Sequence, residues 1–321
     1  MALHVRLARP ADLAQAHALV ATGSRGLYGA DVLAELPRWW REVIHARRLE
    51  LYVFEDDSQP AARRIRLVAS GGFVPDTHAD AIVAGFQPGL AHRVVASELA
   101  GTPVLLDRAG QAVANAGPGV NALGLDFACA EPDWSVLGLV RWAPLLIESL
   151  RGWLDGWKLR LAVREVVGRD LSLMARASGL PRLVAAPVAS RQATPAERRY
   201  LHGMSRQQAQ RRPTSLQAVL FFRDHAPRFH FSPGEQDLLL LALRNRSDAA
   251  CADELGLSPD TVKMRWRGIF ERVAAHRPDW FPASAGADGS GADRTTRGVE
   301  KRRHLLAYLQ RHPEELRPYQ R

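Results

Sequence analysis

One segment, residues 231–273, constrains the fold of this chain more than any other, because it predicts three short helices joined by tight turns. The second and third helices are separated by Leu-Gly-Leu-Ser-Pro at residues 255–259. Gly256 can adopt the left-handed conformation that ends a helix, Ser258 can cap the next helix, and Pro259 suits its first turn. Two helices are therefore expected to meet at a sharp angle.

The helix after this turn has one apolar face. Its apolar side chains recur at spacings that place them on one side of a helix: Val262, Trp266, Ile269, Phe270 and Val273. The other side and its shoulders are expected to meet the major groove of DNA through Ser258, Thr261, Lys263, Met264, Arg265 and Arg267. Arg267 is expected to read guanine, whereas Thr261 and Arg265 are better placed for phosphates.

Two more helices are predicted upstream of this turn. Ser247 can cap a short helix over residues 248–255, whose alanines allow another helix to cross closely. Before it, Ser232 and Glu235 open a leucine-rich helix. This order is typical of a helix-turn-helix, in which one helix positions the next in the groove.

The segment resembles the LuxR/GerE-type helix-turn-helix of bacterial transcriptional regulators. The matching residues are Ser232, Glu235, Leu239, Ser247, Leu255, Leu257, Ser258, Thr261, Val262, Lys263, Ile269 and Phe270. The resemblance implies a C-terminal all-α domain with double-stranded DNA as its partner. Gly234 and Arg265 depart from the usual pattern, which affects the contact set. One such motif reads a half-site, so a homodimer is expected on DNA.

Charge is uneven along the chain. The 43 basic and 34 acidic residues give a net charge of +9. Residues 1–190 hold 20 basic and 19 acidic residues, whereas residues 191–321 hold 23 and 15. A basic surplus in the C-terminal third agrees with a polyanionic partner such as DNA.

Length and composition indicate the number of domains and the general class of protein. A chain of 321 residues is expected to form two domains, and Cys129 and Cys251 have no metal-binding spacing. No apolar run reaches the roughly 18 residues of a membrane-spanning helix, and the N-terminus lacks a signal-peptide pattern. We expect a cytoplasmic protein with no membrane partner, no metal and no cofactor.

Breaks in the pattern divide the chain into five parts. They are an α/β or α+β sensory or dimerisation domain at 1–190, a basic connector at 191–228, the helix-turn-helix domain at 229–281, a flexible linker at 282–297 and a basic C-terminal helix at 298–321. Within the connector, residues 196–210 are expected to be helical. Residues 216–222 are expected to dock under the DNA-binding helices.

The first 190 residues alternate strand-like and helix-like segments. Strands are expected at residues 49–54, 65–70, 104–106 and 159–167, and helices at 11–20, 30–46, 90–100 and 137–154. Residues 102–116 resemble the opening of a PAS domain, a strand, turn and strand that line a ligand pocket. The order of segments beginning at 5–20 and ending at 159–180 is instead similar to a GNAT N-acetyltransferase.

The GNAT resemblance predicts a coenzyme A-binding turn in the sequence. Such enzymes use an Arg-x-x-Gly-x-Gly turn whose amides cradle the pyrophosphate of coenzyme A at a helix N-terminus. The corresponding residues, Ser135-Val-Leu-Gly-Leu139, lack this turn. A GNAT-like domain here is therefore expected to lack acetyltransferase activity.

Other candidate sites are weaker. Asp76, His78 and Asp80 look like a polar loop or strand edge, and His202 has no recognisable catalytic partner. No catalytic residue is assigned.

The sequence thus predicts a multidomain transcriptional regulator that is not an enzyme, with an N-terminal module for dimerisation or for a small-molecule effector. The alternative is a GNAT-like acyltransferase-fold enzyme fused to a DNA-binding tail.

Overall fold

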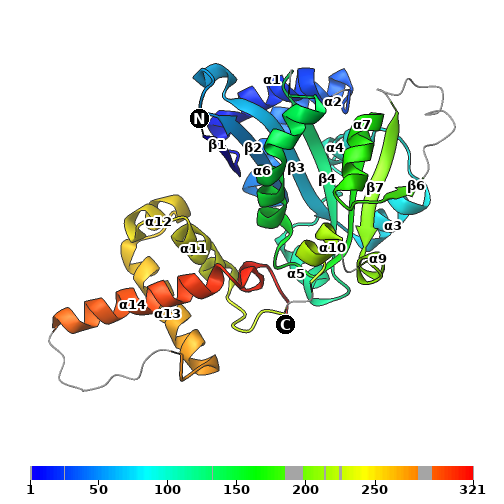
Figure 1. The fold of residues 1–321 in the computed structure, drawn as a ribbon. Coiled ribbons are helices and arrows are strands. Elements are labelled where there is room, and N and C mark those ends of the chain that lie inside the picture. The colour runs from blue at the N-terminus through cyan, green and yellow to red at the C-terminus, as the bar shows by residue number, and fades with distance from the viewer. Residues whose placement is uncertain are drawn as a thin grey trace. The chain divides into compact units, whose positions relative to one another are not determined.

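The computed structural model of the protein describes residues 2–24, 26–131, 133–184, 198–212, 215–223, 226–280 and 291–320. The chain divides into two compact units, residues 1–224 with residue 320, and residues 225–319 with residue 321. Figure 1 shows the strands in the first unit and helices in the second. No described helix is both long enough and apolar enough to cross a membrane.

The first unit is built on a mixed seven-stranded sheet in the order β1-β2-β3-β4-β5-β7-β6. The strands are β1 (Leu3–Leu7), β2 (Leu49–Asp56), β3 (Ile65–Val74), β4 (Val120–Cys129), β5 (Leu159–Val167), β6 (Arg182–Val184) and β7 (Arg199–Ser205). Neighbouring strands pair antiparallel, except that β4 and β5 are parallel. The sheet agrees with the expected α/β or α+β class of this part of the chain.

Helices cover both faces of the sheet (Figure 1). One face packs against α1 (Leu13–Gly23), α2 (Ala30–His45), α3 (Asp76–Ala84) and α4 (Leu90–Leu99) in a single apolar core. The other face carries α6 (Val136–Leu154), α7 (Arg169–Ala177) and α10 (Leu216–Phe221). The remaining short helices of this unit are η1 (Pro10–Asp12), η2 (Ala61–Arg63), α5 (Arg108–Ala116) and α9 (Arg206–Gln210).

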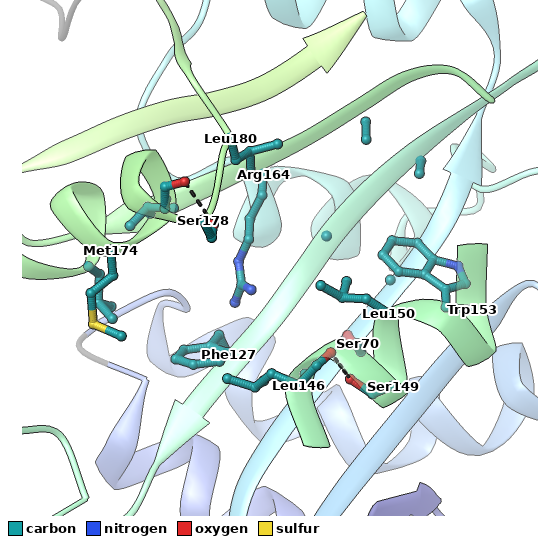
Figure 2. A pocket seen from close by; sticks show the side chains of 18 of the residues that line it. Ser70, Phe127, Leu146, Ser149, Leu150, Trp153, Arg164, Met174, Ser178 and Leu180 are labelled. Carbon is teal, nitrogen blue, oxygen red and sulfur yellow. Dashed lines mark hydrogen bonds between the residues drawn. The ribbon is translucent and has the colours of Figure 1, made fainter. Parts of the chain in front are cut away.

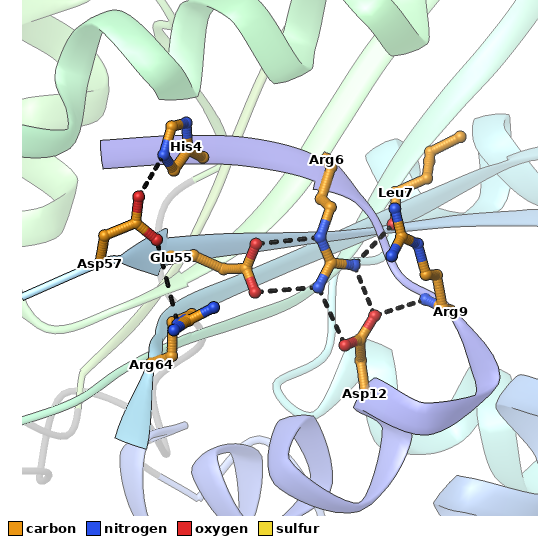
Figure 3. A network of polar contacts seen from close by, with 8 residues as sticks. All are labelled: His4, Arg6, Leu7, Arg9, Asp12, Glu55, Asp57 and Arg64. Carbon is orange, nitrogen blue, oxygen red and sulfur yellow. Dashed lines mark hydrogen bonds and ion pairs between the residues drawn. The ribbon is translucent and has the colours of Figure 1, made fainter. Parts of the chain in front are cut away.

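The edge strand β1 is fixed by a charged network (Figure 3). Arg6 Nη1 donates to Asp12 Oδ2 at 2.6 Å, and Arg6 Nη2 donates to Glu55 Oε1 at 2.9 Å. Asp12 Oδ2 also accepts a hydrogen bond from the backbone N–H of Arg9 at 2.6 Å. One guanidinium thus ties β1 both to β2 and to the turn that leads into α1, which suits the planar fork of arginine.

Several local predictions for this unit are confirmed. The expected strands at 49–54, 65–70 and 159–167 are β2, β3 and β5, and the expected helices at 11–20, 30–46, 90–100 and 137–154 are α1, α2, α4 and α6. Strands β1, β4, β6 and β7 were not predicted. Asp76, His78 and Asp80, expected in a polar loop or strand edge, lie in the helix α3 instead, and Asp76 and Asp80 pair with Arg160.

The expected strand at 104–106 and the PAS-like hairpin at 102–116 are both wrong. The N–H groups of Val104 and Leu105 donate to the Glu98 carboxylate at 2.5 and 2.8 Å, so a side chain takes the place of a strand ladder. Asp107 then accepts from the N–H of Gly110 at 2.8 Å and caps α5, so the chain continues as a helix.

The expectations for the connector are wrong in part, although residues 206–210 of the expected helix at 196–210 do form α9. Residues 199–205, expected within a helix, form β7, whose pairing with β5 runs from Leu161↔Ser205 to Val167↔Arg199. Tertiary pairing here overrides local helix propensity. Residues 216–221 form α10 of the first unit, where Phe221 packs with Trp153 and Trp157. The expected docking segment is therefore part of the core of the first unit.

The second unit contains α11 (Pro233–Leu243), α12 (Asp248–Leu255), α13 (Pro259–His276), α14 (Gly291–Leu309) and η3 (Pro313–Leu316). The expected caps are present: Ser232, Ser247 and Ser258 each accept a hydrogen bond from a backbone N–H of the following helix. Gly256 ends α12 at a φ of 63°, the left-handed conformation that its turn requires.

The C-terminal helix expected within residues 298–321 is α14, which begins earlier, at Gly291, and ends at Leu309. Of the expected flexible linker at 282–297, residues 282–290 lie outside the described part of the chain, and the rest belongs to this helix. Leu305, Leu309 and Leu316 join the core formed by α11, α12 and α13. Arg302 donates to Asp248 at 2.7 Å and lies 4.4 Å from the Trp266 ring centre.

Candidate functional site

The two parallel strands at the centre of the sheet separate part of the way along their length. The pairing of β4 with β5 ends at Gly124↔Arg164, although β4 continues along β3 to Cys129 and β5 continues along β7 to Val167. The register of β3 against β4 shifts between Ala69 and Gly71, so Leu125 and Asp126 together oppose Ser70. A gap therefore opens between β4 and β5, and their facing backbone groups need partners other than each other.

A cavity of about 310 Å³ lies at this gap (Figure 2). Its walls come from both sides of the sheet. Ser24 and Leu27 come directly after α1 on one side, whereas most of the lining belongs to α6, α7 and α10 on the other. The apolar lining includes Phe127, Leu139, Ala143, Leu146, Ile147, Leu150, Trp153, Leu171, Met174, Leu180, Leu220 and Phe221. Such a lining fits an apolar ligand.

Helix α6 supplies one wall because a single stripe of its surface turns to the sheet. Five of its lining residues recur every three or four positions: Leu139, Ala143, Leu146, Leu150 and Trp153. The Trp153 ring lies against Gly71 of β3, where any side chain would collide with it. Gly71 thus allows a large aromatic ring to close the cavity next to the sheet.

One cation faces this apolar space. Arg164 of β5 points into the cavity, with its guanidinium 4.4 Å from the centre of the Phe127 ring (Figure 2). Its Nη2 donates to the backbone carbonyl of Asp126 at 3.3 Å, and no ion pair joins it to a carboxylate of the described residues. Burial lowers the pKa of Arg164 to about 10, so it keeps its charge at neutral pH.

A buried carboxyl group lies on β4 at the same gap. Asp126 is fully buried and accepts hydrogen bonds from Tyr28 at 2.5 Å, from Trp40 at 3.2 Å and from the Ser70 hydroxyl. Burial raises the pKa of Asp126 above its ordinary value, although these donors favour its charged form. Ser70 also lines the cavity, so it connects the buried carboxyl group to the ligand space.

The neighbouring acid, Glu165, has a structural role. Its carboxylate accepts from the N–H groups of Gly89 and Leu90 at 2.8 and 2.6 Å, and Arg199 pairs with it at 3.2 Å. Glu165 thereby holds the N-terminus of α4 against β5. Glu165 lines the cavity but is paired with Arg199, whereas Asp126 has no ion pair among the described residues and reaches the cavity through Ser70.

The start of α6 does not form a phosphate cradle. Ser135 accepts from the N–H of Gly138 at 2.9 Å and caps the helix with its own side chain. A side chain at Gly138 would collide with the backbone of Asp133, and the Asp133 carboxylate pairs with Arg66 at 2.8 Å. The cap therefore occupies one of the amides that a pyrophosphate would need at this helix end.

The residues expected to contact DNA gather on α13. Ser258 caps the helix and bonds Thr261, Lys263 pairs with Asp260 at 3.2 Å, and Arg267 pairs with Glu271 at 2.8 Å. Met264 is 62 % exposed. Arg265 is only half-buried and donates to the carbonyl oxygen of Gly234 at 3.3 Å. Contact of these residues with double-stranded DNA, and a homodimer on DNA, stay predictions.

The expected inward face of the same helix is confirmed. Val262, Trp266, Ile269 and Val273 are buried, and Phe270 is partly buried. His202, for which the sequence offered no partner, lies in the core of the first unit. Its Nε2 is 2.8 Å from Ser172 Oγ and its Nδ1 is 2.9 Å from the carbonyl oxygen of Leu180. This pair anchors α7 to β7.

The sequence did not reveal the residues at the gap. Asp126 lies in a strand that was not predicted, and its partners Tyr28 and Ser70 are distant in the sequence. Arg164 alternates with apolar residues of β5, a pattern that normally indicates an exposed side chain. The one sequence signal for the site was Arg164 itself, a charged residue within a strand that lies in the middle of the sheet.

Comparisons with known proteins give only remote similarities. No protein-family model and no curated protein matches the chain. Among solved structures, FeeM, an N-acyl amino acid synthase from uncultured soil microbes, has a TM-score of 0.40 and 12% identity, over 68% of this chain and 96% of its own. Mutant forms of the spermidine/spermine N-acetyltransferase SpeG from Vibrio cholerae have a TM-score of 0.38 and 11% identity, over 66% and 98%. FdhC, a nucleotide-linked sugar GNAT, has a TM-score of 0.36 and 8% identity, over 68% and 94%.

These comparisons correct the main functional expectation. The structures found are those of enzymes with the GNAT fold, over the part of the chain that holds the sheet. The expectation of a transcriptional regulator that is not an enzyme, with transcription regulation and DNA binding as its function, is therefore wrong. The alternative of a GNAT-like acyltransferase-fold enzyme agrees better with them.

Proposed function

We propose that the first unit is an acyltransferase that accepts acyl chains longer than acetyl and transfers them from a thioester to an amine. The observation that carries this proposal is the apolar cavity at the gap between β4 and β5, with a buried cation and a buried carboxyl group beside it. The cavity gives the acyl chain a place to bind, and the two polar groups lie where the chemistry would occur.

The size of the cavity supports a long chain. A cavity of about 150 Å³ in another protein holds benzene, so 310 Å³ has room for on the order of a dozen carbon atoms. Each buried methylene contributes roughly 0.8 kcal/mol, or about fourfold in affinity. An acetyl group would use little of this space and would gain little of this binding energy.

The polar groups suit the steps of acyl transfer. The amine nitrogen attacks the thioester carbonyl carbon, the carbon–nitrogen bond forms, the carbon–sulfur bond breaks, and the thiol leaves. Arg164 would donate a hydrogen bond to the carbonyl oxygen as it becomes negative. Asp126 would accept the amine proton through the Ser70 hydroxyl, which passes its own proton to the carboxylate. The departing thiolate takes this proton from Asp126 through the Ser70 hydroxyl, so the products are an amide and a thiol and the carboxylate is regenerated.

The second unit does not enter this proposal. Its finer assignment, a LuxR/GerE-type domain that would bring the enzyme to DNA, is an extension supported by the capped helices α11, α12 and α13. The proposed acyl transfer requires only residues of the first unit. The two ideas can therefore fail separately.

The test is release of thiol from acyl N-acetylcysteamine thioesters of two to twelve carbons, with amino acids and polyamines as amine acceptors. The proposal expects turnover that rises with chain length and is lost in Asp126→Asn. The matched control is Asp57→Asn, which removes an exposed carboxylate that pairs with His4 away from the cavity. Absence of turnover with every chain and acceptor, or equal turnover in Asp126→Asn, would contradict the proposal.

A further inference from the structure

A second concavity of the first unit is lined by three arginines. Arg176 is at the end of α7, Arg182 begins β6, and Arg212 follows α9. Together with Gly179, Pro181 and Ser215 they surround a cleft of about 500 Å³, hereafter the arginine cleft. Its described lining contains no carboxylate.

The arginine cleft has an uncompensated positive charge. All three guanidinium-bearing residues are exposed, and none forms an ion pair with a residue of the described ranges. Arg182 lies 4.6 Å from the centre of the Tyr200 ring, which orients it without neutralising it. Burial lowers the pKa of the neighbouring His202, and Arg182 and Arg176 lower it further. Arginine clusters of this kind bind phosphate through planar, bidentate contacts.

The arginine cleft adjoins the acyl cavity. Residues 174–182 contribute to both, because Met174, Ser178 and Leu180 line the acyl cavity and their neighbours line the cleft. The same holds after α9, where Ser215 borders the cleft and Gln217 borders the cavity. A ligand with an apolar chain and an anionic group could therefore occupy both at once.

The N-terminus of α6 does not offer a comparable anion site. Ser135 caps one of its amides, the exposed Glu131 lies nearby, and the Asp133 carboxylate is paired with Arg66. A phosphate-bearing acyl donor would therefore be held more strongly by the arginines. We propose that the arginine cleft binds a phosphate ester of the acyl donor. This inference rests on the proposed acyl transfer.

The experiment compares three donors that carry the same decanoyl chain. They are the N-acetylcysteamine thioester, which has no phosphate, the phosphopantetheine thioester, and the coenzyme A thioester. Binding to the full chain is measured by calorimetry at two salt concentrations. We expect the phosphate-bearing donors to bind at least about tenfold more tightly than the phosphate-free one, with an advantage that falls as salt rises. An equal gain in affinity for both phosphate-bearing donors would show that the cleft binds the phosphate that they share. A gain for the coenzyme A thioester alone would show that it binds the phosphates of the nucleotide part.

Substitutions identify the site of this effect. Arg176→Gln, Arg182→Gln and Arg212→Gln are each expected to reduce the phosphate advantage roughly threefold to tenfold, without changing affinity for the N-acetylcysteamine thioester. The matched control is Arg211→Gln, an exposed arginine that does not line the cleft. Equal binding of all three donors, or an equal loss in Arg211→Gln, would overturn the inference and leave acyl binding intact. Failure of the phosphate-free thioester to bind would instead overturn the proposed acyl transfer, and this inference with it.

Discussion

Filling the acyl cavity from its α6 wall should shorten the chains that the protein prefers. Ala143 is in the middle of the lining stripe of α6, so Ala143→Leu would place three additional carbon atoms in the cavity. They would displace about three methylenes of a decanoyl chain. At roughly 0.8 kcal/mol for each methylene, the binding free energy would weaken by about 2.4 kcal/mol, or about 50-fold in dissociation constant.

Acetyl binding should not change, because a two-carbon group does not compete for this space. The assay is competition binding of N-acetylcysteamine thioesters of two to twelve carbons to the parent and to Ala143→Leu. Ala177→Leu is the matched control, since it adds the same side chain at the exposed end of α7, outside the cavity. A folded Ala143→Leu variant that binds every chain like the parent, or that loses all lengths equally, would refute the reasoning.

Three further predictions concern stability. The raised pKa of Asp126 means that the folded state holds its proton more tightly, so the parent's free energy of unfolding should fall relative to that of Asp126→Asn as pH rises above about 4; parallel pH–urea titrations check this. Asp56 behaves in the opposite way, because hydrogen bonds from Ser58, then Arg141, lower its pKa to about 2. The parent should lose stability relative to Asp56→Asn as pH falls from about 4 to 2, and a constant difference would refute this. Leu305 is fully buried, so Leu305→Ala should destabilise the second unit by about 2–5 kcal/mol in urea unfolding, whereas no change would show that α14 is not part of its core.

Local signals in the sequence were read correctly. Ser232, Ser247 and Ser258 cap their helices, and Gly256 takes the left-handed conformation expected between α12 and α13. Each depends on residues within a few positions of one another. The same holds for the long amphipathic helices α2 and α6, whose periodicity predicted them.

Features that depend on distant partners were missed. Strand β4 contains Asn121, Gly124 and Asp126, residue types that are poor strand formers, and it forms because β3 and β5 pair with it on both sides. The cavity has no local signature at all, since it exists only where β4 and β5 separate and α6, α7 and α10 close over the gap. The local pattern of α11, α12 and α13 is visible in the sequence, so the functional prediction rested on the second unit.

The decisive measurement is a crystal structure of the full chain with a ketone analogue of the decanoyl donor, in which a methylene group between the carbonyl carbon and the sulfur prevents acyl transfer. The account predicts that the acyl chain lies among the apolar residues of α6, α7 and α10, with the carbonyl oxygen within hydrogen-bond distance of Arg164. Density for the chain anywhere else, with the cavity between β4 and β5 empty, would contradict it.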